Sequence, residues 1–320
     1  MTDLRRGVIA MIVACTLWGL SPIFYKIIGP VPATEVLAHR TFWSLVFFVA
    51  LLAIQGRLAA FGAALTTPAL VKWMALAATL ISVNWFLFIY AVQMGRTIET
   101  SLGYYIFPLM AVLLGVVFFK ERMSRARLLA VALAALAVAL LAFGLGALPW
   151  MSLALATTFG FYGVLKKRLA LGPVISVAAE VALLTPLALI WLIWLHAGQG
   201  AQVPGIFGRD LQTSLLLVVS GPVTALPLVL FSYASQRVAL STVGLLQYIN
   251  PTLQFVCAVV IFREPFTAIH ATAFALIWVA LGIYSLAASG EGRARRKIAM
   301  TTSGDAPVVT KPASDASAKP

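Results

Sequence analysis

The chain has 320 residues, of which 62% are hydrophobic and only 10% are charged, whereas an ordinary soluble domain carries about 25% charged residues. No soluble core of this length hides so much apolar surface, so the composition excludes a soluble globular protein and indicates a protein whose solvent is lipid. The net charge of +13 does not indicate nucleic-acid binding, because the basic residues lie in short gaps between apolar runs, as in membrane proteins.

Ten apolar segments follow one another along the chain, and each is close to the roughly 20 residues that a membrane-spanning helix needs. In chain order they cover residues 8–28, 33–54, 71–93, 98–119, 127–143, 149–167, 174–195, 212–234, 240–262 and 267–288. The first segment is too long for an ordinary signal-peptide core, and no small-x-small cleavage site follows it. We therefore predict an all-α membrane protein with ten transmembrane helices.

The glycine-rich stretch 144–148 divides these segments into five and five. This division predicts a first five-helix repeat over residues 7–146 and a second five-helix repeat over residues 149–289. The remaining residues, 290–320, are first basic and then rich in Ser, Thr, Ala and Pro. For this part we expect a disordered cytoplasmic tail, whose basic end rests near anionic lipid headgroups.

The distribution of Lys and Arg predicts how the helices cross the membrane. With the N-terminus in the cytoplasm, the inner segments hold 18 Lys and Arg residues and the outer segments hold three, Arg96, Arg209 and Arg263. This bias places both termini inside. Because five is an odd number, the second half then enters the membrane from the opposite side. The expected fold is therefore a pair of five-helix repeats with inverted topology.

A repeated motif supports the duplication. Tyr105-Ile106-x-Pro108 with Phe119-Lys120-Glu121 recurs 143 positions later as Tyr248-Ile249-x-Pro251 with Phe262-Arg263-Glu264. Between residues 88–121 and 231–264, 12 of 34 pairs are identical without a gap. In the inverted topology, Lys120-Glu121 should lie inside and Arg263-Glu264 outside.

The first two helices carry charged groups near or within the membrane. Lys26 lies near the outer end of the first helix, and the second helix begins with Glu35, followed by His39 and Arg40. Glu35 and His39 are four residues apart and can pair. His39 and Arg40 would lie about 9–11 Å along the helix. Two interpretations stay open: a charge network at headgroup level that orients the helix, and a site for substrate contact or proton coupling.

Further candidates for a substrate cavity are aromatic and amide side chains of helices one, three and four. They are Trp18, Tyr25, Asn84, Tyr104, Tyr105 and Phe107. Tyr104 and Tyr105 fit an interfacial belt and a cavity wall equally well. Pro108 removes a backbone hydrogen bond inside the fourth helix, either as a fixed kink or, with its counterpart Pro251, as a bending point for gating.

The seventh and ninth helices carry the remaining polar groups. Glu180 aligns with His39 at an offset of 141 residues, and it is either a coupling group or the partner of Lys167 or Arg168 at the inner face. Gln247, Asn250 and Gln254 share one face of the ninth helix. Such a stripe either hydrogen-bonds to another helix or lines a cavity.

Catalytic, cofactor and metal motifs are absent from the sequence. The chain has no phosphate-binding Gly-x-x-x-x-Gly-Lys-Ser/Thr loop, no His-Glu-x-x-His and no Gly-x-Ser-x-Gly. Cys15 and Cys257 lie inside apolar runs without metal-ligand spacing. We expect no catalytic residues, no metal and no cofactor.

Several short motifs, taken together in this order, resemble the RarD-type transporters of the EamA family in the drug/metabolite transporter superfamily. The motifs are Trp18-Gly19, Glu35, His39-Arg40, Trp43-Ser44, Asn84-Trp85, Ser101-Leu102-Gly103-Tyr104, Pro108-Leu109, Phe159-Gly160-x-Tyr162-Gly163, Thr224-Ala225-Leu226-Pro227-Leu228, Gln247-Tyr248-x-x-Pro251-Thr252 and Glu264-Pro265. The resemblance runs from about residue 7 to residue 288 and implies two EamA-type inverted repeats around a central cavity in a bacterial inner membrane. It also implies export of small organic molecules, and the family is associated with chloramphenicol sensitivity. This chain departs from many relatives at Gln93 and Phe107, where they carry Asn.

The sequence therefore predicts a secondary active transporter that exports small organic metabolites or drugs by alternating access around a midplane cavity. Aromatic side chains would form the cavity walls, amides would orient the substrate, and His39 or Glu180 would carry a coupling proton. The alternative is a non-transporting membrane scaffold or an intramembrane enzyme. The expected partners are a small-molecule substrate and the lipid bilayer, without nucleic acid; a monomer and a homodimer both stay open.

Overall fold

The computed structural model describes residues 3–120, 124–144, 146–169, 171–197, 205–238, 242–243 and 246–304, and within these residues it contains no strand. Its helices are α1 (Asp3–Ile27), α2 (Ala33–Ile54), α3 (Leu58–Thr66), α4 (Pro68–Gln93), α5 (Thr97–Phe119), α6 (Arg125–Gly144), α7 (Trp150–Arg168), α8 (Pro173–His196), α9 (Leu211–Ser235), α11 (Ile249–Val256) and α12 (Ala268–Gly304). A five-residue π-helix, Cys257–Ile261, continues α11.

Eight of these helices are long and apolar enough to cross a membrane, and a shorter apolar helix covers Ile249–Ile261. The eight are α1, α2, α4, α5, α6, α8, α9 and the first part of α12. The sixth predicted segment, 149–167, corresponds to α7, a helix of 19 residues that ends in Lys166-Lys167-Arg168. The prediction of an all-helical, multi-pass membrane protein is thus confirmed.

Local sequence signals explain where several helices begin. Pro68 occupies the first turn of α4, where its missing N–H costs nothing. Asp210 caps α9, because its carboxylate accepts hydrogen bonds from the backbone N–H groups of Gln212 at 3.2 Å and Thr213 at 2.7 Å. Hydrogen bonds from Thr213 lower the pKa of Asp210. Helix α3 was not predicted, because its nine residues are too few to cross a membrane.

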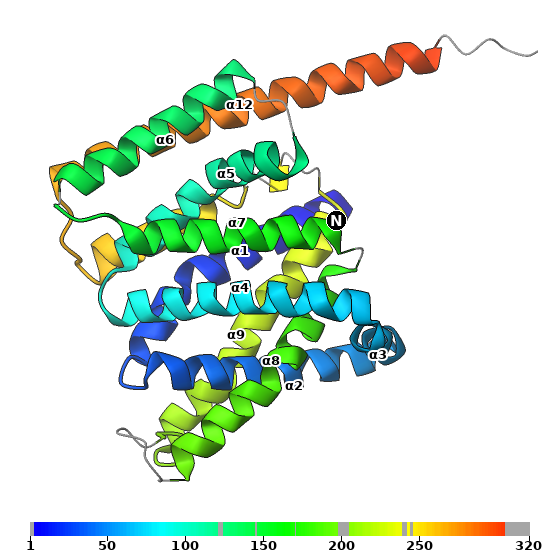
Figure 1. Ribbon diagram of the computed structural model, residues 1–320, viewed down its shortest axis with the longest axis vertical. Helices are drawn as coiled ribbons and strands as arrows, with labels where there is room; N and C mark the ends of the chain where they lie inside the picture. Colours follow the sequence, from blue (N-terminus) through cyan, green and yellow to red (C-terminus); the bar gives the residue numbers. More distant parts are fainter. Residues whose placement is uncertain are drawn as a thin grey trace, which may run out of the picture.

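The helices form a layered bundle (Figure 1). Helices α6 and α12 pack against each other along one edge, and α5 contacts both of them. Helix α7 packs between α5 and α4, while α2 contacts α8 and α9 on the far side of the bundle. Buried apolar side chains fill the contacts between these layers, for example around Tyr105 and Phe274 and around Phe48 and Val181.

The ninth predicted segment, 240–262, is not one continuous α-helix. Helix α11 begins only at Ile249, after a turn at residues 247–248. Pro251 therefore lies in the first turn of α11 and not in a helix interior. A helix that continued through Pro251 would lose a backbone hydrogen bond and would place the proline ring against a carbonyl group. Pro108, in contrast, lies inside α5 as predicted.

Two non-glycine residues of the described chain have a positive φ angle, and both belong to the repeated motif. Lys120 has φ 52° and Arg263 has φ 53°. Left-handed residues terminate helices, and a residue other than glycine adopts this conformation only against a steric cost of roughly 1–2 kcal/mol. The same strained ending, 143 residues apart, is a backbone signature of the duplicated motif.

At the C-terminal end, α12 continues past residue 290 to Gly304. The sequence predicts a disordered tail over residues 290–320. Its last part, residues 305–320, lies outside the described residues, so disorder there stays a prediction.

Candidate functional site

Asn84 lies at the centre of a hydrogen-bond network between three helices. Its side chain is completely buried. The amide nitrogen donates to the Leu155 carbonyl and to the Thr158 hydroxyl of α7, each at 2.9 Å, and its oxygen accepts from the Tyr104 hydroxyl of α5 at 3.2 Å. Since a buried amide without partners is costly, this network fixes α4, α5 and α7 relative to one another.

Three of the predicted cavity residues, Tyr25, Tyr104 and Phe107, meet in this region through aromatic contacts. A row of ring contacts joins Tyr25 to Phe88 at 5.8 Å between centroids, Phe88 to Tyr104 at 6.0 Å, and Tyr104 to Phe159 at 6.0 Å. Phe159 then contacts Phe107 at 4.7 Å. The row connects α1, α4, α5 and α7, so residues distant in sequence form one aromatic surface beside the Asn84 amide. Phe88 and Phe159 were not predicted as site residues.

Arg40 projects from α2 onto the same aromatic surface. Arg40 is only 6% exposed, and its guanidinium carbon lies 4.2 Å from the centroid of the Trp85 ring and 5.7 Å from that of the Tyr25 ring. A cation–π contact contributes about 0.5–2 kcal/mol. The effective cost of burying an ion is several kcal/mol, so the aromatic contacts alone do not offset it. In the sequence, Trp85 stands out only as the neighbour of Asn84 in the Asn84-Trp85 motif.

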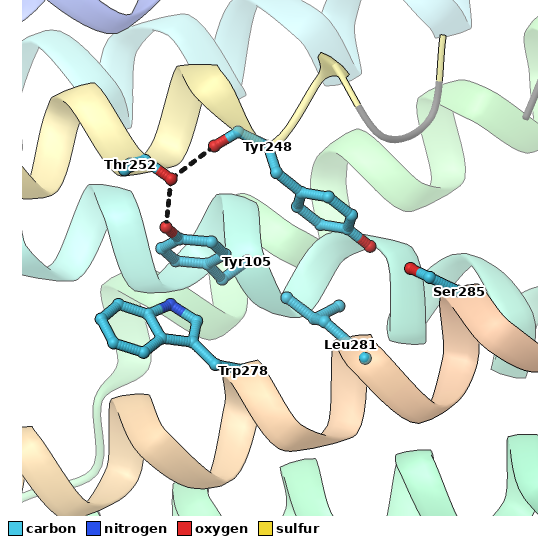
Figure 2. A pocket seen from close by; sticks show the side chains of 7 residues that line it. Tyr105, Tyr248, Thr252, Trp278, Leu281 and Ser285 are labelled. Carbon is cyan, nitrogen blue, oxygen red and sulfur yellow. Dashed lines mark hydrogen bonds between the residues drawn. The ribbon is translucent and has the colours of Figure 1, made fainter. Parts of the chain in front are cut away.

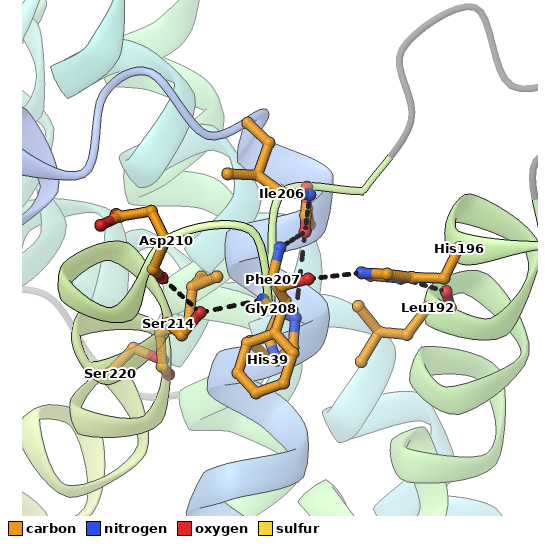
Figure 3. Close-up of polar contacts among 11 residues, drawn as sticks. His39, Leu192, His196, Ile206, Phe207, Gly208, Asp210, Ser214 and Ser220 are labelled. Atoms are coloured by element: carbon orange, nitrogen blue, oxygen red, sulfur yellow. Dashed lines mark hydrogen bonds and ion pairs between the residues drawn. The ribbon is translucent and has the colours of Figure 1, made fainter.

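Glu35 and His39 both contact the segment of residues 205–210 that precedes α9. Figure 3 shows His39 beside Phe207 of this segment. Glu35 Oε1 accepts hydrogen bonds from the backbone N–H groups of Ile206 at 2.8 Å and Phe207 at 3.1 Å. The His39 ring stacks on the Phe207 ring at 4.6 Å. His39 Nε2 also lies 4.0 Å from Glu35 Oε1, so the predicted pair of Glu35 and His39 is present.

His196 contacts the same segment from α8 (Figure 3). Its Nδ1 lies 2.8 Å from the Leu192 carbonyl oxygen and its Nε2 lies 3.2 Å from the Phe207 carbonyl oxygen. This contact could not be predicted from the sequence, in which His196 has no acidic or metal-binding residue at a recognisable spacing.

Glu180 belongs to a buried network between α7 and α8. Lys166 Nζ lies 2.6 Å from Glu180 Oε1, and the hydroxyls of Ser176 and Tyr162 donate to the carboxylate at 3.1 and 3.0 Å. Lys166 also donates to Ser176. The sequence suggested Lys167 or Arg168 as partners. Among the described side chains the partner is Lys166, while the side chains of Lys167 and Arg168 lie outside the described part of the structure. A charge partner in the next helix cannot be chosen from spacing alone.

The three amides of the ninth segment lie in different environments. Gln254 is buried and accepts a hydrogen bond from Thr100 of α5 at 3.0 Å, while its own amide donates to Asn250 Oδ1 at 2.8 Å. Asn250 is half-buried and Gln247 is exposed. Ser101 adds a hydrogen bond from α5 to the Pro251 carbonyl at 2.8 Å. Of the two interpretations of this stripe, hydrogen bonding to another helix therefore applies to Gln254.

Trp18, Lys26 and Tyr105 lie apart from the aromatic surface around Asn84. Trp18 contacts Phe231 of α9 at 5.8 Å, and exposed Lys26 lies 5.7 Å from the Phe262 ring. Tyr105 lines a cleft of about 440 Å³ between α5, α11 and α12 (Figure 2). The other lining residues are Tyr248, Thr252, Trp278, Leu281, Gly282 and Ser285.

Glu264 of the repeated motif caps α5 from another part of the chain. Its Oε1 accepts from the backbone N–H of Thr97 at 2.7 Å and its Oε2 accepts from that of Ile98 at 2.8 Å. A carboxylate at this position satisfies two free N–H groups and complements the helix dipole. Glu121, its counterpart in the first half, lies outside the described residues. No three His, Cys, Asp or Glu side chains of the described chain are grouped to hold a metal ion.

Comparison with known proteins gives consistent matches. Residues 5–143 match the model of the EamA-like transporter family. An uncharacterized transporter of Vibrio cholerae is 39% identical over 92% of this chain and 97% of its own length. Protein RarD of Salmonella typhimurium is 40% identical over 88% and 94%, and Protein RarD of Streptomyces exfoliatus is 42% identical over 93% and 95%.

A solved crystal structure also has a similar fold. It superposes with a TM-score of 0.59 at 20% sequence identity, covering 88% of this chain and 97% of the other. At this identity the likeness concerns the arrangement of the helices alone.

Proposed function

The chain belongs to the RarD-type members of the EamA-like transporter family, which are multi-pass transporters of the bacterial inner membrane, and from this premise we propose that it is a secondary transporter working by alternating access. Its substrates are small organic molecules, and the direction is export. The observation that carries the proposal is the group formed by the buried Arg40 and Asn84 and the half-buried Tyr104, because polar groups inside a membrane mark a substrate or ion pathway.

The proposed fold is ten transmembrane helices in two inverted five-helix repeats, 7–146 and 149–289, with both termini in the cytoplasm. Helix contacts support this pairing. Helix α1 packs on α9, and α4 packs on α7, which are the first and third helices of opposite halves in both cases. Such reciprocal contacts are expected when two halves are related by a pseudo-twofold axis in the membrane plane.

Two close glycine contacts support the same relation. A Cβ atom on Gly19 of α1 would lie 2.6 Å from Leu253 Cβ of α11, and one on Gly160 of α7 would lie 2.7 Å from Leu114 and 3.2 Å from Met110 of α5. Gly160 follows Gly19 by 141 residues and Leu253 follows Met110 by 143, so the same pair of positions meets in both halves. Small residues at both crossings permit close helix packing.

The proposed substrate site lies where α1, α2, α4, α5 and α7 meet. Tyr25, Tyr104 and Phe107 contribute aromatic walls, and Asn84 positions polar groups of the substrate. Glu180 with Lys166, and His39 with Glu35, are the proposed coupling groups on opposite sides. Pro108 inside α5 is the proposed bending point of the first half.

Transport by the purified protein in liposomes tests the proposal. We expect uptake or efflux of at least one solute from a wide panel of metabolites and antibiotics, driven by a proton or solute gradient. Protein-free liposomes and liposomes with heat-denatured protein are the controls. If no solute of the panel moves faster than in these controls, the proposal of a transporter is wrong and a scaffold or an intramembrane enzyme takes its place.

A further inference from the structure

Arg40 is the buried cation of the described chain that has no anionic partner. Its position in the second turn of α2 places it inside the segment that crosses the membrane. Its contacts are the faces of Trp85 and Tyr25, and its Nε atom is buried without a hydrogen-bond acceptor among the described residues. Buried guanidinium groups normally bind carboxylates or phosphates through their planar array of N–H donors.

The carboxylates of the described membrane region are engaged elsewhere. Each accepts hydrogen bonds or forms an ion pair with another group: Glu35 with Ile206 and Phe207, Glu99 with Arg96, Glu180 with Lys166, and Glu264 with Thr97 and Ile98. No described acidic side chain lies within ion-pair distance of Arg40. The protein therefore provides a cation at this depth without providing its counter-charge.

Other donors near Arg40 also lack acceptors. Trp43, three residues further along α2, has a buried indole N–H without an acceptor in the described chain, and the His39 ring, which carries at least one N–H, makes no hydrogen bond through either nitrogen. These three side chains lie within about 100° of one another around the helix. An excess of donors over acceptors is the chemistry that recognises an anion.

The surroundings of this donor group are apolar and aromatic. Trp85 and Tyr25 lie against Arg40, and the ring row continues through Phe88 and Tyr104. Flat apolar groups pack well on such rings, while a strongly hydrated ion lacking an apolar part would find few partners there. The arrangement therefore combines one charged contact with a long apolar contact.

We propose that Arg40 binds the carboxylate of an organic anion whose apolar body lies against the aromatic side chains of α1, α4 and α5. The substrate class of the transporter is then organic carboxylates. This inference rests on the proposed transport function for its role, whereas the binding site itself requires only the arrangement of Arg40 and its neighbours.

Calorimetric titration of the full chain in lipid nanodiscs tests the site with probes that differ only in charge. Three matched sets are used: benzoate, benzamide and benzylamine; 4-phenylbutyrate with its amide and amine; and hexanoate with its amide and amine. We expect the carboxylate of at least one set to bind about tenfold to a hundredfold more tightly than its amide and amine, which is the usual worth of hydrogen bonds to a charged group. Empty nanodiscs correct for partition into lipid.

Variants assign the preference to Arg40. Arg40→Gln should abolish the preference for the carboxylate and leave the affinity for the amide unchanged. Arg40→Lys, which keeps the charge but loses the planar fork, should retain part of it. Arg96→Gln is the matched control, because Arg96 is partly exposed and already paired with Glu99 at 2.5 Å; it should bind like the wild type. Gel filtration and the thermal unfolding midpoint establish that each variant is folded.

The inference is overturned if carboxylates bind no better than amides or amines in all three sets, including the case in which no probe binds. It is also overturned if Arg40→Gln and Arg40→Lys, both folded, keep the full preference. Transport measurements separate this outcome from the proposed function. Transport of neutral solutes that is unaffected by Arg40→Gln would support the transporter and contradict this site. Arg40-dependent binding without any transport would support this site and contradict the transporter.

Discussion

Gly221→Val is expected to destabilise the protein by about 3 kcal/mol, the upper end of the range for overpacking, or to prevent folding. A Cβ atom at Gly221 of α9 would lie 2.4 Å from the backbone carbon of Trp43 and 2.7 Å from the Ser44 nitrogen of α2. These atoms belong to backbone and cannot move aside as a flexible side chain can, so α2 and α9 must separate. The Ser44 hydroxyl would then also lose its hydrogen bond of 3.2 Å to the Gly221 carbonyl.

The thermal unfolding midpoint in detergent measures this effect. Gly163→Ala in α7 is the matched control, because no atom lies within 4 Å of a Cβ at that position. A helix gains roughly 0.5–1 kcal/mol when Ala replaces Gly in its interior, so the control should be unchanged or slightly more stable. An equal unfolding midpoint for Gly221→Val and the wild type would show that α2 and α9 are not packed as described.

Glu180→Leu is the second change with a large expected effect. It removes the carboxylate that pairs with Lys166 at 2.6 Å and leaves an ammonium group in an apolar contact between α7 and α8. Breaking a buried pair in this way costs about 3–5 kcal/mol, and the lower end applies here because Lys166 is 23% exposed. The unfolding midpoint should fall accordingly.

Two further variants distinguish a lost charge partner from a lost side chain. The double variant Lys166→Met with Glu180→Leu should recover most of the stability, because an apolar pair of similar volume replaces a buried ion pair at little net cost. Glu99→Gln disrupts the more exposed pair with Arg96 and should cost at most about 1 kcal/mol. If the double variant were as unstable as Glu180→Leu, the unpaired charge would not be the cause.

The positions of most helices along the chain were predictable, because they depend on apolar length, prolines and capping residues. The segments of α2, α8 and α9 agree with the predicted ranges within a few residues, and Pro68 and Asp210 explain the observed starts of α4 and α9. The break before α11 was not predicted. Apolar length alone does not distinguish a continuous helix from a short helix with a π-helical end.

The polar residues of the proposed site could be singled out by residue type, but their partners could not. Asn84, Tyr104 and Arg40 were identified because polar groups inside a membrane are costly. Their mutual geometry depends on how helices cross, which no spacing within one helix records. The contact of Arg40 with Trp85 and the contact of Glu180 with Lys166 both join different helices, and so neither followed from the sequence.

Two-sided accessibility of position 250 tests the central claim, alternating access, most directly. Asn250 is half-buried in α11, and the native Cys15 and Cys257 are buried, so a single-cysteine variant Asn250→Cys can be made in a background where both are replaced by Ala. A membrane-impermeant thiol reagent is applied to right-side-out and inside-out vesicles, with and without a proton gradient. Alternating access predicts labelling from each side under different gradients. Protection from both sides, or labelling from one side under every gradient, would contradict it.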